Sequence, residues 1–271
     1  SIGYGILRMD EDQPWHPFFL AQPVWCFINA VFFEYGIAAY DLDLGAAIKK
    51  KQTNDPEFRR RAKQVLGKIR KQVTKDYVVH PALSVVTGSA LTTLAANFTA
   101  NVVRNLWSNS VILCGHFPEG VETFEKRSID GETRGEWYVR QMLGSANISG
   151  SKAMHIMTGN LSHQIEHHLF PDLPSNRYAE IAPRVQELFD KYDLNYHSAP
   201  LPQQVYSAWH KVFRLSLPNN WLDTTDRSNL PEQLKTLWAM TTKGPRVRRA
   251  AQARLNQQAR RKAAAGLLPA A

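Results

Sequence analysis

The chain has 271 residues, of which 44% are hydrophobic, and 33 Lys and Arg against 24 Asp and Glu give a net charge of +9. This length allows one large domain or two small ones. It contains only two cysteines, Cys26 and Cys114, each in an apolar stretch, which argues against a disulfide-stabilised scaffold.

The positive charge lies in two places. Residues 45–76 hold eleven Lys or Arg and three acidic residues, and the chain from Lys243 onward holds eight basic residues and no acidic one. Neither run carries a zinc-finger spacing or an RNA-binding signature, so we expect no nucleic-acid partner. Anionic membrane lipid is the expected partner of such runs beside apolar segments. We predict that residues 221–271 form a basic, disordered tail.

The first apolar segment covers residues 17–40, with Glu34 as its only charge. As a continuous helix it would reach about 36 Å, enough to cross a hydrocarbon core of roughly 30 Å. We therefore predict a membrane span at about residues 17–40. A buried core helix is the alternative.

An amphipathic basic helix is expected within residues 46–76, followed by a second apolar run at about residues 78–116. The second run fits one long helix or a hairpin. Two single spans would leave the basic loop on the outer side, against the positive-inside rule, whereas a re-entrant first segment with a hairpin would satisfy it. Polar side chains interrupt this run and are expected to face a protein interior or cavity: Asn97, Asn101, Arg104, Asn105 and Asn109.

Beyond His116 the chain becomes more polar. Charge and glycine predict a loop at residues 119–136. A short helix is expected at 136–144, and a longer helix that carries the histidine cluster is expected at 147–169. Ser175 or Asn176 can cap a further helix. In that helix an apolar stripe at spacings of three and four is expected to pack as core: Tyr178, Ile181, Val185, Leu188 and Tyr192.

Three histidines lie within six residues, His163, His167 and His168. On a helix, Gln164, His167 and His168 share one face. Imidazole suits iron, zinc and copper, and such a cluster is costly to keep for packing alone. The cluster therefore predicts a metal site, and a metal-free surface patch is the alternative.

The string Gln164-Ile165-Glu166-His167-His168 resembles the third histidine box of membrane fatty-acid desaturases, in the form where glutamine replaces the first histidine. The flanking stretches 114–121, 131–137 and 170–178 are also similar to actinobacterial acyl-CoA desaturases. The resemblance covers residues 1–220 and implies an all-α integral membrane helical bundle. A cytoplasmic helical cap, residues 116–192, would carry the histidine box. The protein would lie in the cell membrane with its metal site facing the cytoplasm.

The same resemblance implies an oxygen-dependent reaction that introduces a double bond into a long-chain fatty acyl-CoA. Two irons would activate O2, and NADPH would supply electrons through a separate reductase or ferredoxin. His167 and His168 would bind iron directly, Gln164 weakly or through water, and His116 would be the extra histidine that related enzymes contribute. His163 is a further candidate ligand, although it points about 100° away around a helix. Glu166 is a candidate partner that orients the ligand rings.

The family carries two earlier histidine boxes, yet before residue 150 this chain has only His16, His80 and His116. We expect it to be the C-terminal part of a desaturase, with an incomplete iron ligand set and no activity alone. A related di-iron lipid hydroxylase and an inactive membrane remnant remain alternatives. A zinc protease is a third, because His163-Gln164-Ile165-Glu166-His167 matches the His-x-x-Glu-His pattern.

Overall fold

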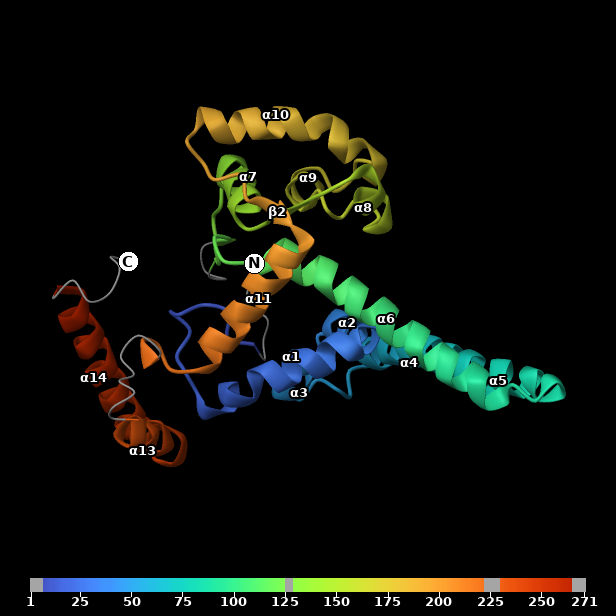
Figure 1. Ribbon diagram of the computed structural model, residues 1–271, viewed down its shortest axis with the longest axis horizontal. Helices are drawn as coiled ribbons and strands as arrows, with labels where there is room; N and C mark the ends of the chain where they lie inside the picture. The colour runs from blue at the N-terminus through green and yellow to red at the C-terminus, as the bar shows by residue number, and fades with distance from the viewer. Residues whose placement is uncertain (1–6, 125–128, 222–229, 265–271) are drawn as a thin grey trace. The chain divides into compact units, whose positions relative to one another are not determined.

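The computed structural model describes residues 7–124, 129–221 and 230–264, and it divides into two compact units (Figure 1). Unit 1 combines Ser1–Cys26 with Leu113–Ala271, and unit 2 is Phe27–Ile112. Helices dominate both units, in agreement with the expected all-α class. The exception is a pair of short parallel strands in unit 1, β1 (Asn147–Ser149) and β2 (Ser198–Pro200).

Unit 2 is built from helices joined by short turns. Its elements are the end of α1 (Gln22–Val31), α2 (Phe33–Asp41), α3 (Leu44–Lys49), α4 (Pro56–Thr74), a π-helical turn η2 (Lys75–Val79), α5 (His80–Leu83), the 3-10 turn η3 (Ser84–Thr87) and most of α6 (Ala90–His116). The basic helix expected within residues 46–76 is therefore present as α4. Asp55 begins it, because its carboxylate accepts hydrogen bonds from the backbone N–H groups of Glu57 and Phe58.

The apolar segment at residues 17–40 is not the one straight helix that the sequence led us to expect. A 3-10 turn η1 (Pro17–Ala21) leads into α1, and the helix axis then bends by 99° before α2. Phe32 lies at the bend with φ −111° and ψ 34°, outside the helical region, so the hydrogen-bond ladder breaks there. Within the described ranges, no lone helix has both the length and the apolarity to cross a bilayer; the bent pair Pro17–Val31 and Phe33–Asp41 has them jointly.

The second apolar run folds as short turns followed by one long helix, α6. Its polar side chains are used inside unit 2. Asn101 donates to the Asp76 carboxylate (3.0 Å), Asn97 donates to the Asp76 carbonyl (2.6 Å) and Asn105 donates to the Val31 carbonyl (3.0 Å). Arg104 pairs with Glu34. The expectation that these polar groups face a protein interior is confirmed for Asn101, Asn105 and Asn109, which are buried, whereas the Arg104 side chain stays 46% exposed.

Unit 1 holds the histidine-rich sequence. Its helices are α7 (Arg134–Leu143), α8 (Lys152–Met157), α9 (Gln164–Leu169), α10 (Tyr178–Lys191), α11 (Leu201–Ser216), α13 (Leu230–Thr242) and α14 (Pro245–Ala264), with a 3-10 turn η5 (Ser175–Arg177) before α10. The predicted helix at 136–144 is confirmed as α7. It starts with a capping box in which Thr133 and Glu136 satisfy each other's backbone N–H groups.

The single helix predicted for residues 147–169 is wrong. The segment instead forms β1, α8, a turn and α9. The turn is fixed by Gly159 and Asn160, which both have φ of 62°, in the left-handed region that glycine and asparagine tolerate best. The break re-aims α9 and leaves His163 before its first turn.

Helix α9 packs against both α7 and α10 (Figure 1). Buried side chains from the three helices form a core between them. This core comprises Met142, Ile165, Leu169, Val185 and Phe189. The predicted α10 stripe is only partly correct, because Leu188 and Tyr192 are 46% and 63% exposed whereas Phe189 is fully buried. The buried residues of α10 are Tyr178, Val185 and Phe189, which keep the helical spacing with Phe189 in place of Leu188.

The C-terminal region also differs from the disordered tail that the sequence predicts. Its described part forms α13 and α14, and Met240 and Leu255 are buried together with Trp221. Burial of these apolar side chains stabilises a helix pair despite the charge of α14. Residues 222–229 and 265–271 of the predicted tail lie outside the described residues.

Candidate functional site

Three polar side chains of the histidine-box region meet where α6 ends and α9 begins. Gln164 lies in the first turn of α9, His168 one turn later and His116 at the last residue of α6. The Gln164 amide NH2 donates to Nε2 of His168 (3.1 Å) and to Nε2 of His116 (3.3 Å). The two imidazole rings are 5.0 Å apart. The predicted i, i+4 relation of Gln164 and His168 is thus present, and His116 joins them from far away in the sequence.

The hydrogen bonds fix the tautomer of His168. Because its Nε2 accepts from Gln164, its proton lies on Nδ1, which donates to Oε1 of Gln141 on α7 (3.2 Å). A partner on Nδ1 that leaves Nε2 free to donate its lone pair is the usual arrangement of a metal-binding histidine.

His167 is held in a comparable way. Its Nδ1 lies 3.0 Å from the hydroxyl oxygen of Tyr178, and its ring is 5.6 Å from that of His168. Tyr178 is almost fully buried at the start of α10, so its hydroxyl is a fixed partner. The sequence assigned Tyr178 to the core only, and the structure adds this polar contact.

Burial keeps these imidazoles neutral. It lowers the pKa of His168 to about 4, with a smaller contribution from His167, and it lowers the pKa of His167 as well. A neutral imidazole has a lone pair for a metal, whereas a protonated one has none. The site therefore presents metal-binding forms of both residues at neutral pH.

Gly115 makes room for Gln164. A Cβ atom on Gly115 would lie 2.8 Å from Cγ and 3.0 Å from Cδ of Gln164, closer than carbon atoms approach without displacement. Glycine at this position therefore allows the carboxamide to reach between His116 and His168.

His163 is not brought to this group. It precedes α9 with φ −96°, and its ring stacks on that of His155 at 4.7 Å. His155 is thus a close neighbour, although on a continuous helix it would share the face of His163 only loosely. Nε2 of His163 is buried with no hydrogen-bond partner in the described part of the chain.

Glu166 ties α9 to its neighbours. Its fully buried carboxylate accepts from Nδ2 of Asn147 (2.8 Å) and from the hydroxyl of Tyr196 (2.8 Å). Asn147 in turn accepts from the backbone N–H of Ile165 (2.8 Å). Burial and the adjacent carboxylate raise the pKa of Tyr196, so it stays a donor. Glu166 therefore anchors the helix that carries the histidines, and in the described part of the chain its hydrogen bonds go to Asn147 and Tyr196, not to the rings of His167 and His168.

This geometry argues against the zinc-protease alternative. In that reading His163 and His167 would bind one zinc and Glu166 would act as a general base. His163 stacks on His155 and His167 contacts Tyr178, while Glu166 is enclosed by Asn147 and Tyr196. Glu166 is fully buried and accepts a hydrogen bond on each oxygen, so its carboxylate serves the packing of α9 in this structure.

The sequence did not assign four residues to the site, Gln141, Asn147, Tyr178 and Tyr196, although it placed Tyr178 in the core stripe of α10. They reach α9 from α7, β1, α10 and the segment before β2, and only tertiary contacts reveal them. Within the described ranges, no three His, Cys, Asp or Glu side chains are arranged to hold a metal. His116 and His168, which converge on Gln164, would therefore supply only part of a metal ligand set together with Gln164.

Comparison with known proteins agrees with this site. A model of the fatty acid desaturase family matches residues 4–200. The chain belongs to the fatty acid desaturase family. The matched residues include α6, α9 and every site residue described above.

The chain is 46% identical over 224 residues to a Mycobacterium tuberculosis protein named NADPH-dependent stearoyl-CoA 9-desaturase, which covers 82% of this chain and 52% of that protein. It is 31% identical over 99 residues to a Bos taurus protein named fatty acid desaturase 3, covering 36% of this chain and 20% of that protein. The chain spans about half the length of the mycobacterial relative. No solved structure matches it.

Proposed function

We propose that this desaturase-family chain forms the iron-binding C-terminal region of an oxygen-dependent fatty acyl-CoA desaturase. The observation that supports this most is the convergence of Nε2 of His116 and Nε2 of His168 on one point, now filled by the Gln164 amide. Two lone pairs directed at a hydrogen-bond donor would equally suit a cation. His116, His167 and His168 are the proposed iron ligands.

The supporting residues have defined roles in this proposal. Gln141 and Tyr178 hold the rings of His168 and His167, and Gly115 leaves space for Gln164. Turning the Gln164 carboxamide would present Oε1 in place of the NH2 group, as a weak ligand or as an acceptor for a bound water. Asn147 and Tyr196 keep Glu166 and therefore α9 in position.

Iron bound there would supply the oxidising power needed to break unactivated C–H bonds. The overall reaction removes two hydrogens from adjacent acyl carbons and consumes one O2, two electrons and two protons to give a double bond and two waters. The mycobacterial relative's name supports NADPH as the electron source and stearoyl-CoA as the substrate to test. We propose that a separate reductase or ferredoxin carries the electrons, and that the site faces the cytoplasm of the cell membrane.

The test is a pair of substitutions, His167→Ala and His168→Ala, in the protein expressed in membranes from its own gene. Each removes one proposed ligand, so iron per chain and conversion of stearoyl-CoA to a monounsaturated product should both fall at least tenfold. Iron is measured by mass spectrometry of the purified protein, and the product is analysed by gas chromatography. A hydroxylated product would support a lipid hydroxylase.

His210→Ala is the matched control. His210 is exposed on α11 and pairs with Glu119, outside the histidine group, so its removal should leave iron and product unchanged. Full iron loading in His168→Ala would contradict the ligand assignment, and loss of iron in His210→Ala would show a general folding defect.

A further inference from the structure

Helix α4 in unit 2 has two unlike faces. A half-buried stripe of Phe58, Ala62, Val65 and Ile69 repeats at helical spacing. At the end of the helix, Asp76 is buried against Asn101 of α6. The remaining face of α4 stays exposed and carries most of its cations.

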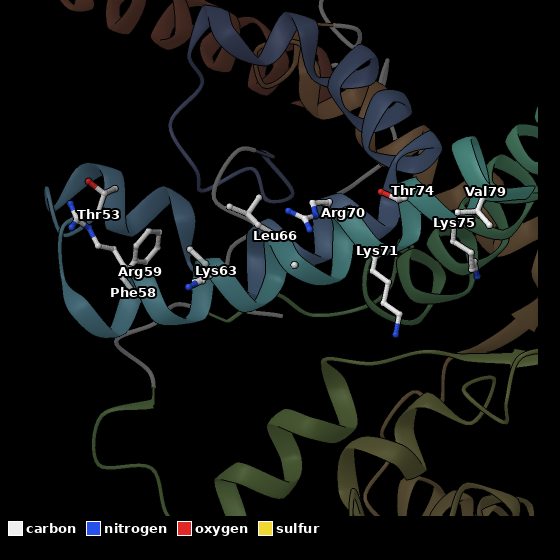
Figure 2. Close-up of a pocket in the computed structure, with 12 residues that line it drawn as sticks. Thr53, Phe58, Arg59, Lys63, Leu66, Arg70, Lys71, Thr74, Lys75 and Val79 are labelled. Atoms are coloured by element: carbon white, nitrogen blue, oxygen red, sulfur yellow. The ribbon is translucent and has the colours of Figure 1, made fainter. Parts of the chain in front are cut away.

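An open groove of about 980 Å³ runs along α4 from Thr53 to Val79, and its lining includes Phe58 and Ala62 of the half-buried stripe (Figure 2). Five basic side chains line it, Arg59, Lys63, Arg70, Lys71 and Lys75. None of its described lining residues is acidic. A groove with cations and no carboxylate selects an anionic ligand.

Among the described residues, four of these cations have no carboxylate partner, and one of them, Arg59, donates instead to the side-chain oxygen of Asn54 (2.7 Å). Elsewhere on the helix Arg60 pairs with Glu57 and Arg61 pairs with Asp41. In the groove Lys75 lies 3.5 Å from Asp76, whereas no ion pair joins Lys63, Arg70 or Lys71 to any described acidic residue. These three are free to bind phosphate oxygens.

Apolar side chains share the cationic face. Leu66, three residues after Lys63 and four before Arg70, is 63% exposed, and Val79 at the end of the groove is 42% exposed. The chain then continues into the turns before α6, where Leu83, Val85 and Val86 are exposed by 61–90%. A helix surface that combines unpaired cations with exposed aliphatic side chains matches the boundary between lipid headgroups and acyl chains.

We propose that the α4 groove binds the phosphate headgroups of anionic phospholipids, with Leu66 and Val79 against their acyl chains. Charge complementarity selects the lipid class, and the aliphatic side chains distinguish a lipid from a free phosphate. The site lies wholly within unit 2, so the inference does not depend on the proposed reaction.

The test uses the purified chain in neutral detergent, titrated with short-chain phosphatidylglycerol and with short-chain phosphatidylcholine. Bound lipid is counted by native mass spectrometry. Phosphatidylglycerol should bind preferentially, and the triple variant Lys63→Gln, Arg70→Gln, Lys71→Gln should weaken that binding roughly 100-fold. Leu66→Ser should weaken it several-fold with the charge unchanged.

A second triple variant, Arg246→Gln, Arg249→Gln, Arg254→Gln, removes the same charge from exposed positions of α14 and should leave the lipid preference intact. If both triple variants lost phosphatidylglycerol binding equally, while circular dichroism showed unchanged helix content, the proposed site would be overturned. Binding of inorganic phosphate or coenzyme A as tightly as phosphatidylglycerol would instead assign the groove to a soluble phosphate ligand. Preferential capture of an RNA oligonucleotide would overturn the proposal in favour of nucleic acid.

Discussion

Gln164 is the residue on which the site depends most. Its amide lies between two imidazole nitrogens, and the resemblance to the family's histidine box gives it the position of the first histidine. A glutamine there is neutral and can present either a donor or an acceptor. It can therefore hold the histidines apart by hydrogen bonds and still turn an oxygen toward a cation.

Gly115→Ala tests this arrangement at the residue scale. Its new methyl group would displace Gln164, because the Cβ atom would lie 2.8 Å from Cγ of Gln164. We expect iron affinity to fall about tenfold, as is typical when the surroundings of a metal site are disturbed. Iron binding is measured by competition with a chelator of known affinity.

Gly67→Ala provides the control for Gly115→Ala. Both glycines lie inside long helices, but nothing lies within 4 Å of a Cβ atom on Gly67. The control should stabilise the protein by about 0.5–1 kcal/mol and leave iron unchanged. If Gly115→Ala also kept its iron, the close approach of Gln164 would have no role in the site.

At the element scale, α7 matters because it carries Gln141, the partner of His168. A bidentate ion pair joins Arg140 of α7 to Glu132 of the preceding loop. Nε of Arg140 donates to Oε1 of Glu132 (2.5 Å), and Nη2 donates to Oε2 (2.8 Å). Hydrogen bonds from Arg140 hold the pKa of the Glu132 carboxyl below its usual 4.5. This ion pair therefore links the position of α7 to pH.

The sign of this link follows from the lowered pKa. A carboxyl whose pKa is lower in the folded protein contributes stability above the unfolded-state value, and that stability is lost as the pH falls through the folded-state value. Glu132→Gln should therefore melt at a lower temperature than the wild type at pH 7, and the difference should disappear in acid below the folded-state pKa. Circular dichroism melts of both proteins across this range test it. A difference that is constant with pH would mean that the ion pair contributes no stability.

Sequence patterns located some of these elements and missed others for identifiable reasons. The basic helix α4 and the short helix α7 were predictable because periodicity and caps act locally. The break at Gly159 and Asn160 was missed, although a Gly-Asn pair is a turn signal, because the helical spacing of the histidines suggested one continuous helix. The bend at Phe32 has no such signal.

In the candidate site, too, the sequence predicts local relations and misses contacts between residues that are distant along the chain. The i, i+4 relation placed Gln164 and His168 together from sequence alone, whereas His116 entered only through the family resemblance. Gln141, Asn147 and Tyr196 contact α9 from sequence distances of 19 to 30 residues, and no local rule connects them. Their roles depend on how α7, β1 and the segment before β2 pack around a short helix.

At the scale of the whole molecule, the proposed iron site and the proposed lipid site lie in different units. Unit 1 contains the histidine group and its anchors, and unit 2 contains the basic groove and most of the exposed aliphatic surface. The phospholipid titration and the iron measurements therefore report on separate parts of the chain. Loss of lipid binding in the α4 variant should leave the iron content unchanged.

The most direct test of the central claim is the metal content of the wild-type protein purified from cells grown with both iron and zinc. Mass spectrometry should find iron bound to the protein and released by a chelator, and His168→Ala should lower it. Zinc in place of iron, or a protein that binds neither metal, would contradict the proposal that His116, His167 and His168 form part of an iron centre.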